Sequence, residues 1–457
     1  MKKYLYCLVV LMVTGNILFA SCDKPKITEE DSAEVEVVLY ANDDEGSSRI
    51  VKVYKGHVME TPRWIPNSRR GYTFYRWCKD RQGTEPFDFE NEKIEAPVVL
   101  YAAWSRDIIL EDCGKISRVT GATLPDETLI NPNQTHERWG LGGTDLGIIW
   151  EMNDGEYGLL FGDSYGSDFK PAPGGGPAGA GDWRSNVLAY SDDVTLADGL
   201  SFSGMMTDGH NDKRAAPIIE RENYYSFTYI PTAAICLNGV QYMHYMYWEV
   251  GNTVHADQNY SSIYKSDDNG RTWESCRGQI SFSSTSYFAM GGYAVKEGDP
   301  YCYMLGTQSG VGYRNSPAKL ARFKYDDILD RSKYEYWNAS KRKWMVGKES
   351  NASVLLDGTI GELSIFWHEE FQRWITLYFD AQEYAICYRS AANITGPWSE
   401  ERVLCSGWTT GYSQLYGSYI HPASVEKGSK TLYYTMSLWV PYNVFLMKAN
   451  IKLAPEK

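Results

Sequence analysis

Residues 147–161, GIIWEMNDGEYGLLF, decide the fold because they predict a β-hairpin. Two short apolar segments flank Asn153-Asp154-Gly155, a three-residue turn whose glycine can take the left-handed conformation that such turns need. Centring the hairpin on Asp154 pairs Glu151 with Tyr157 and, continuing outward, Asp145 with Asp163. The register therefore predicts that these two aspartates face one another beyond the strands.

The same alternation of apolar strand, glycine or acidic turn, aromatic strand and polar strand recurs from about Leu141 to Ile451. One such sheet of about 40 to 60 residues cannot bury both its faces alone, and sheets of this kind pack around an axis as propeller blades. We count five units and predict an all-β chain with a five-bladed β-propeller at 141–453. The units are 147–164 with 185–193, 233–248 with 261–273, 293–307 with 319–325, 363–380 with 384–398, and 419–439 with 443–451.

The N-terminus predicts export. Lys2 and Lys3 precede an apolar run, and small residues stand directly before Cys22. We therefore expect a lipoprotein signal peptide at 1–21, lipidation of Cys22 and a polar tether at 22–34, although Phe19 stands where a lipobox usually has Leu, Val or Ile. The run is too short to span a bilayer comfortably, so the expected membrane attachment is a lipid anchor.

Residues 35–105 form a separate small β-rich segment. Alternating strands lead to GYTFYRWCKDRQGTEPFDF and then to the closing strand LYAAW. This stretch resembles the internalin-type B repeat, or Listeria-Bacteroides repeat, of bacterial surface proteins, although Arg76 and Cys78 replace the usual Gly and Tyr. The resemblance implies a small β-grasp-like spacer or adhesion domain, and we expect residues 106–140 to form a connector. The matching residues are Gly71 to Phe74, Trp77, Asp80, Gly83, Thr84, Phe87, Phe89 and Leu100 to Trp104.

Composition narrows the partners. A net charge of −13 argues against nucleic-acid binding, because a protein that binds nucleic acid requires a basic face. The 35 Tyr and 15 Trp supply flat side chains that can stack on sugars, although β-rich proteins use aromatic residues in strands as well. The nine cysteines include no CxxC pair, so we expect no zinc site and mostly small buried apolar roles for them.

The paired aspartates are the candidates for chemistry. Glycoside cleavage needs two carboxyl groups beside one bond, and opposed cross-strand residues have Cβ atoms about 4.5 to 5.5 Å apart. From the residues alone, Asp145 and Asp163 are equally typical of turn-capping aspartates. A slip of one residue in the register would also turn one of them to the other face.

The propeller segment resembles a bacterial family associated with endo-D-arabinanases that cut the D-arabinan of mycobacterial cell walls. The resemblance implies that Asp145 and Asp163 are the catalytic carboxyl groups, one the general acid and the other the nucleophile or base. Which is which stays open, as does retention or inversion. The matching stretches are GGTDLGIIWE, LLFGDSYG, DWRSNVLAYS, PTAAICLNG, KLARFKYDDILD, YEYW, GELSIFW and YGSYIHP with WVPYNVFLMK.

Further residues are candidate substrate contacts. They follow a glycine- and proline-rich loop, KPAPGGGPAGAGD, or begin later units of the repeat. Each could instead be a strand-end residue that holds the backbone by hydrogen bonds. The candidates are Trp183, Arg184, Asn186, Glu362, Tyr419 and His421.

Together these features predict an endo-acting glycoside hydrolase for α-arabinofuranosidic linkages of arabinan, with D-arabinan implied by the family. One alternative is a non-catalytic glycan-binding propeller, and another is a glycosidase for L-arabinan or another furanoside. Acid–base chemistry of this kind requires no cofactor, and no metal ligand is assigned. We expect a monomer, lipid-anchored in the cell envelope at the outer membrane or cell surface, with a polysaccharide as its partner.

Overall fold

The computed structural model describes residues 33–43, 45–67, 69–177, 181–220, 227–249 and 259–456. The predicted signal peptide, Cys22 and nearly all of the tether lie outside these residues. Within the described chain, no helix combines the length and apolar character that crossing a bilayer requires. The chain divides into two compact units, the first holding residues up to 62 with 77–102 and the second 63–76 with 103 onward.

The first unit is built on a four-stranded sheet in the order β2-β1-β6-β4. Strand β1 is antiparallel to β2 and parallel to β6, so the sheet is mixed, and its alternation buries Val37 and Leu39 on one face. No helix occurs among the described residues of this unit, so the predicted β-grasp-like character is limited to the mixed sheet. The strands are β1 (Glu34–Tyr40), β2 (Ser48–Tyr54), β3 (His57–Val58), β4 (Tyr72–Cys78), β5 (Lys93–Ile94) and β6 (Val98–Arg106).

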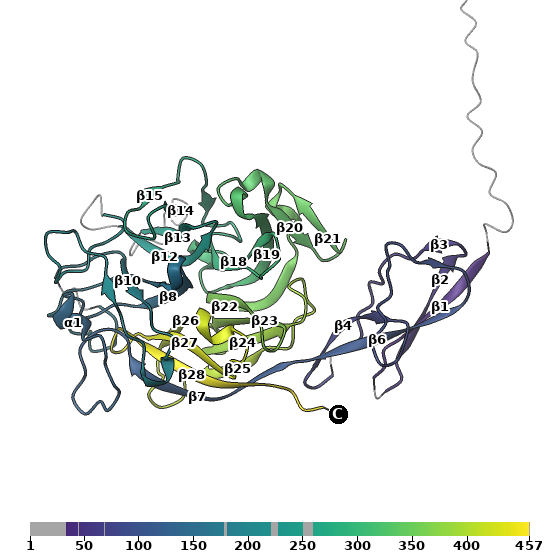
Figure 1. Ribbon diagram of the computed structural model, residues 1–457, viewed down its shortest axis with the longest axis horizontal. Helices are drawn as coiled ribbons and strands as arrows, with labels where there is room; N and C mark the ends of the chain where they lie inside the picture. The colour runs from purple at the N-terminus through teal and green to yellow at the C-terminus, as the bar shows by residue number, and fades with distance from the viewer. Residues whose placement is uncertain are drawn as a thin grey trace, which may run out of the picture. The chain divides into compact units, whose positions relative to one another are not determined.

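The second unit is all-β apart from short helical turns, as the repeat pattern predicts (Figure 1). Its sheets have the orders β11-β10-β9-β8, β12-β13-β14-β15, β17-β18-β19-β22-β23-β24-β25 and β26-β27-β28-β7. The first elements are β7 (Ile108–Arg118), α1 (Thr135–Arg138), β8 (Leu146–Glu151), β9 (Tyr157–Phe161), β10 (Val187–Ser191), β11 (Gly204–Met205), β12 (Phe227–Leu237), β13 (Val240–Glu249), β14 (Tyr260–Ser266), β15 (Glu274–Ser275) and β16 (Phe282–Ser283). The later strands are β17 (Met290–Ala294), β18 (Tyr301–Thr307), β19 (Ser316–Lys324), β20 (Glu335–Asn338), β21 (Lys343–Val346), β22 (Val354–His368), β23 (Arg373–Asp380), β24 (Ala385–Ala391), β25 (Arg402–Ser406), β26 (Leu415–Ile420), β27 (Thr431–Leu438) and β28 (Asn443–Leu453).

The inner strands form a closed ring. Strand β8 lies beside β12, β12 beside β17, β17 beside β22, β22 beside β26, and β26 beside β8 again. The remaining strands of each sheet follow outward from this ring (Figure 1). The third and fourth predicted units share one nine-stranded sheet, because β19 pairs with β22 as well as with β20. Five separate blades are therefore not confirmed.

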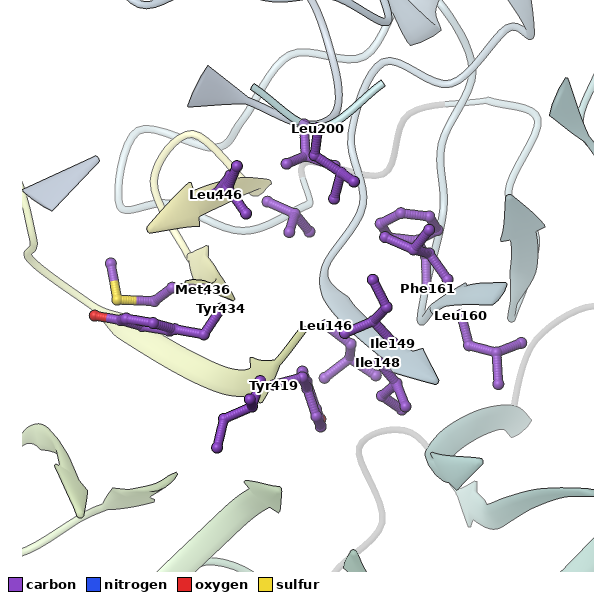
Figure 2. Close-up of a cluster of buried hydrophobic side chains, with 14 of the residues drawn as sticks. Leu146, Ile148, Ile149, Leu160, Phe161, Leu200, Tyr419, Tyr434, Met436 and Leu446 are labelled. Carbon is purple, nitrogen blue, oxygen red and sulfur yellow. The ribbon is translucent and has the colours of Figure 1, made fainter. Parts of the chain in front are cut away.

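Inner strands are buried on both faces. In β8, Ile148 and Ile149 are adjacent in sequence and therefore point to opposite faces, yet both are buried. Figure 2 shows them in one cluster with side chains of β27, including Tyr434 and Met436. This explains why the inner strand is a continuous apolar run without the alternation of a half-buried strand.

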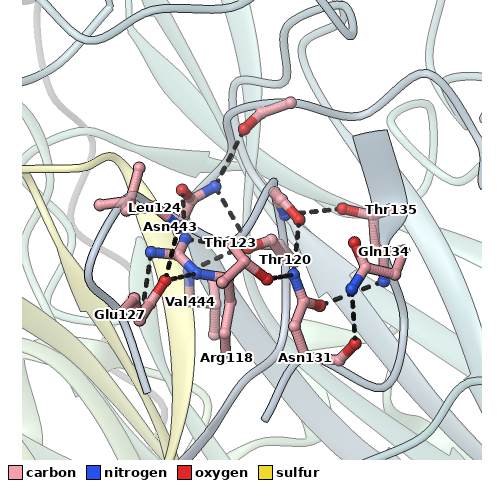
Figure 3. Close-up of polar contacts among 12 residues, drawn as sticks. Arg118, Thr120, Thr123, Leu124, Glu127, Asn131, Gln134, Thr135, Asn443 and Val444 are labelled. Carbon is pink, nitrogen blue, oxygen red and sulfur yellow. Dashed lines mark hydrogen bonds and ion pairs between the residues drawn. The ribbon is translucent and has the colours of Figure 1, made fainter. Parts of the chain in front are cut away.

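The last sheet joins the two ends of the unit. Strand β7 pairs antiparallel with β28, so residues near 110 complete a sheet made otherwise of residues 415–453. At the end of β7, the fully buried Arg118 bonds to Glu127 at 2.8 and 3.1 Å and to Asn443 Oδ1 at 2.7 Å (Figure 3). The segment 106–140 that was predicted as a connector therefore contains a structural strand, because β7 completes the last sheet.

Candidate active site

A cavity of about 1000 Å³ opens at one end of the inner strands. It is lined by carboxyl groups, two arginines and many aromatic side chains. Its lining residues are Asp145, Leu146, Asp163, Tyr165, Pro177, Gly181, Asp182, Trp183, Arg214, Glu220, Thr228, Ile230, Pro231, Thr232, Met246, Trp248, Met290, Gly291, Tyr313, Arg314, Glu362, Leu363, Tyr416, Tyr419, Trp439 and Tyr442.

The β8–β9 hairpin brings Asp145 and Asp163 to this cavity. The predicted turn is present, and Glu151 pairs with Tyr157 as expected. The register then shifts by one residue between Leu146 and Ile148, where Leu146 and Gly147 both have positive φ. Asp145 consequently lies opposite Gly162, whose backbone N–H donates to the Asp145 carbonyl, and the predicted direct opposition to Asp163 is wrong.

The bulge explains why both side chains still reach one cavity. A slip within a regular ladder would turn one residue to the other face. Here the pairing beyond Leu146 is irregular, and an added Cβ on Gly162 would come within 2.4 Å of Asp145 Oδ1. The Asp145 carboxyl group therefore lies across Gly162, toward the residue that follows it in the chain, Asp163.

Asp145 is partly exposed as a residue, but its carboxyl group is largely enclosed. Its Oδ2 accepts a hydrogen bond of 2.9 Å from the Tyr416 hydroxyl, while its Oδ1 is buried without a hydrogen-bond partner. Burial, and after it the negative charge of Asp163, raises the pKa of Asp145 to about 7, although the Tyr416 hydrogen bond opposes the rise. Near neutral pH this carboxyl group can both hold and release a proton.

Asp163 lies in the same cavity and has a comparable exposure. It is partly exposed, and its Oδ1 accepts a hydrogen bond of 2.6 Å from the Thr228 hydroxyl of β12. A hydroxyl donor favours the ionised form of a carboxyl group. Each of the two aspartates thus accepts a hydroxyl hydrogen bond, Asp145 from Tyr416 and Asp163 from Thr228.

Glu362 is a third carboxyl group of the cavity, but it is neutralised. Arg314 Nη2 lies 2.6 Å from Glu362 Oε1, and the Tyr313 hydroxyl donates to the same oxygen at 2.6 Å. Burial acts to raise the pKa of Glu362, but the Arg314 charge and these hydrogen bonds outweigh it, so the pKa lies below its ordinary value. Glu362 is therefore an anion paired with a cation, and it is not suited to donate a proton near neutral pH.

The remaining predicted contacts divide into two groups. Trp183 lines the cavity and is partly exposed. Tyr419 also lines it, but only 2% of the residue is exposed and its hydroxyl is buried without a hydrogen-bond partner. Tyr419 thus belongs to the cavity floor and offers no open ring face, contrary to the predicted stacking role.

Arg184, Asn186 and His421 are not among the lining residues, and each holds backbone instead. Arg184 donates to the carbonyls of residues 140 and 215, and Asn186 bonds to backbone of residues 218, 219 and 229. The buried His421 accepts from the N–H of residue 423, and burial lowers its pKa to about 3. The strand-end interpretation considered from the sequence therefore fits these three residues.

Several site residues were not predicted. Tyr416 lies within the matched YGSYIHP stretch, so its position beside Tyr419 offered a signal. No feature of the sequence pointed to Arg314 or Thr228, because their roles depend on the meeting of strands that are far apart in sequence. Trp248 and Trp439 add flat apolar surface to the cavity. In the sequence they stand in aromatic segments that the repeat pattern already accounted for, so they were not singled out.

The fold and site define a closed ring of β-sheets with an unequal carboxyl pair in a cavity at one end of its inner strands. Residues 131–448 match the family model described as Domain of unknown function (DUF4185), and the chain belongs to this family. Residues 37–103 match the Listeria-Bacteroides repeat domain.

Individual relatives are more distant. The chain is similar to the Notoamide biosynthesis cluster protein J of an Aspergillus species, with 29% identity over 320 residues, covering 67% of this chain and 82% of that protein. Among solved structures it is similar to a family 117 glycoside hydrolase of Zobellia galactanivorans, at 11% identity and a TM-score of 0.42, covering 74% and 90%. It is also similar to an arabinanase of Bacillus subtilis, at 12% identity and a TM-score of 0.37, covering 69% and 96%.

Proposed function

We propose that this protein is an endo-acting glycoside hydrolase that cleaves internal α-arabinofuranosidic linkages of arabinan, with D-arabinan of mycobacterial cell-wall glycans as its substrate. The observation that supports the chemistry best is that Asp145, whose pKa is raised to about 7, lines the same cavity as Asp163. Two carboxyl groups in one cavity, one of them able to hold a proton near neutral pH, are what acid-assisted glycoside cleavage requires.

The environments suggest which residue has which role. Asp145, with a pKa of about 7, is protonated over much of the acidic and neutral range and is our candidate for the general acid at the leaving oxygen. Asp163 accepts the Thr228 hydrogen bond and is our candidate for the ionised partner, acting as nucleophile or as base toward water. Glu362 stays paired with Arg314 and would contribute a fixed dipole to substrate binding.

The cavity lining supports a neutral sugar as substrate. Trp183, Trp248 and Trp439 offer ring faces for C–H surfaces, and the acidic groups disfavour an anionic ligand. Arabinan in particular comes from the sequence resemblance to endo-D-arabinanases. We further propose that the protein is an exported monomer, attached to the cell envelope through a lipid on Cys22.

One experiment tests the activity. Purified protein is incubated separately with mycobacterial arabinogalactan and with L-arabinan, and reducing ends and product lengths are measured for the wild type, Asp145→Asn and Asp163→Asn. Release of oligosaccharides from the mycobacterial polymer by the wild type alone is expected. Release only from L-arabinan would overturn the substrate. Binding without release, unchanged in both variants, would identify a glycan-binding protein instead.

A further inference from the structure

Two thiols from different sheets meet where the last sheet, which contains β7, lies beside β25 of the nine-stranded sheet. Cys113 belongs to β7 and Cys405 to β25, and their sulfur atoms lie 3.1 Å apart although the residues are 292 positions apart in sequence. The Tyr434 hydroxyl lies 3.0 Å from Cys113 Sγ. Cys405 is 3% exposed, whereas Cys113 is only partly buried.

We propose that Cys113 and Cys405 are an oxidation site and form a disulfide cross-link between β7 and β25. A disulfide has an S–S length of roughly 2.05 Å, so the two sulfurs need to approach by only about one ångström. Neither residue requires a rearrangement of its strand for this approach, because β7 and β25 already pack against one another. The proposal does not depend on the hydrolase activity.

The chemistry requires a disulfide oxidant such as glutathione disulfide or an oxidised thiol–disulfide oxidoreductase. The Cys113 thiolate attacks one sulfur of the oxidant and forms a mixed disulfide with it, and the other sulfur leaves as a thiolate. The Cys405 thiolate then attacks Cys113 Sγ and displaces the second thiolate. The protein loses two protons and two electrons, and the oxidant takes them up as two thiols. Exported proteins meet such oxidants outside the cytosol.

The cross-link would act on the closure of the ring. Strand β7 is held to the last sheet by pairing with β28, and β25 is the outer strand of the neighbouring nine-stranded sheet. A covalent bond between them closes a very long loop of chain and constrains the unfolded state most strongly in that case. We expect the oxidised protein to unfold at a temperature several degrees above that of the reduced protein.

The test compares intact mass, thiol alkylation and melting temperature after incubation with reduced or oxidised glutathione. The wild type should lose two hydrogens in mass, keep two fewer alkylatable thiols and melt higher when oxidised. Cys113→Ser and Cys405→Ser should show no such intramolecular change, while Cys236→Ser, which removes a thiol elsewhere, should behave like the wild type. Full alkylation of both thiols in the natively folded, oxidant-treated wild type would overturn the proposal.

A second, independent observation concerns an exposed tryptophan in the loop before β26. Trp408 is 81% exposed, in the loop that leads from β25 to β26. Its ring packs edge-on against Tyr384, with centroids 5.0 Å apart. Gly407 makes room for this arrangement, because a Cβ there would lie 2.5 Å from the Tyr384 ring. The indole is therefore supported from one side and open to solvent on the other.

Hydrogen bonds connect this platform to the cavity wall. The Tyr384 hydroxyl accepts from the backbone N–H of Gln414, and the carbonyl of Gln414 accepts from the N–H of Trp439 at 3.0 Å. Trp439 lines the cavity and is 39% exposed. Tyr384, which packs against Trp408, is thus linked through the backbone of Gln414 to Trp439 of the cavity wall.

We infer that Trp408 is an outer binding site for a furanoside chain that continues out of the cavity, an inference that rests on the proposed function. A sugar stacked on this indole would be several residues away from the cleaved linkage. Its loss should weaken polymer binding and leave the chemistry intact. Stacking of this kind contributes about 0.5–1.5 kcal/mol, which corresponds to an affinity change of roughly 2- to 13-fold.

The measurement is the KM and kcat of Trp408→Ala on polymeric arabinan and on an oligosaccharide short enough to fill the cavity alone. We expect a several-fold rise in KM on the polymer with kcat unchanged, and no change on the short substrate. Val194→Ala, another exposed apolar position, serves as the control. A wild type that cleaves arabinan and a Trp408→Ala variant with the same polymer KM would refute this site alone. A wild type that neither binds nor cleaves would refute the proposed function.

Discussion

Asp145 and Glu362 are carboxyl groups of one cavity, but their pKa values are shifted in opposite directions. Asp145 has no cation in hydrogen-bond contact, so burial and a neighbouring carboxylate raise its pKa to about 7. Glu362 is buried more deeply, but Arg314 and Tyr313 contact it, so its pKa is lowered. The partner of a buried acid, more than the depth of its burial, therefore decides which group can carry a proton.

Removing the carboxyl group of Asp145, whose pKa is raised, should have the largest effect. Asp145→Asn cannot protonate a leaving oxygen, so kcat/KM on arabinan should fall by about 10² to 10⁴-fold. The initial rate of reducing-end release measures this. Asp198→Asn, an exposed aspartate, should retain wild-type rates. An Asp145→Asn variant with more than a tenth of the activity would remove Asp145 from the acid role.

Removing the cation should make Glu362 resemble Asp145. Arg314→Met leaves a buried carboxylate without its partner, which should lower the free energy of unfolding by roughly 3–5 kcal/mol near neutral pH. Urea unfolding measures the loss. Lys452→Met breaks an exposed pair with Glu111 and should cost about 1 kcal/mol or less. If Arg314→Met with Glu362→Gln is no more stable than Arg314→Met alone, the unpaired charge is not the cause.

Displacing the Asp145 carboxyl group should have an intermediate effect. Gly162 has no positive φ, so Ala is compatible with its backbone, but the new Cβ would meet Asp145 Oδ1 at 2.4 Å. The carboxyl group must move, and kcat should fall by about 10- to 100-fold while the protein stays folded. Gly204→Ala, where an added Cβ meets open space, provides the control. Unchanged kcat in Gly162→Ala would show that the position of this carboxyl group is unimportant.

The smallest effect is expected for the Tyr416 hydroxyl, which limits the rise of the Asp145 pKa. The Tyr416 hydrogen bond lowers the pKa of Asp145, so Tyr416→Phe should raise that pKa further above about 7. A general acid works below its pKa, so wild-type kcat/KM should decline as pH rises through about 7, and the decline should move to higher pH in the variant. A pH profile measures the shift. A decline that stays in place or moves to lower pH would contradict the role of Tyr416.

The sequence predicted what depends on local pattern. Apolar runs and turn residues gave the all-β character, the β8–β9 turn and the inner register from Glu151 to Ile148, because these follow from short-range periodicity. The bulge at Gly147 was not predicted, since a glycine in a strand is compatible with both regular pairing and an inserted residue. The two aspartates nevertheless reach one cavity, by an irregular route in place of the predicted ladder.

The partners of the carboxyl groups could not be predicted in the same way. Arg314 and Tyr416 come from strands or loops more than 150 residues from Asp145, and only ring closure brings them to it. The same holds for Arg184 and His421, whose types suggested substrate binding but whose burial commits them to backbone. Residue type indicates what chemistry is possible, and long-range packing decides whether it is used.

The pairing of β7 with β28 also fixes the order of events during synthesis. Residues 108–118 leave the ribosome more than 300 residues before their partner strand at 443–453. Until then β7 has no β28 to pair with, and Arg118 has no Asn443 to bond to. The last sheet therefore cannot be completed on a chain that ends before β28, and the fold itself distinguishes a finished polypeptide from a truncated one.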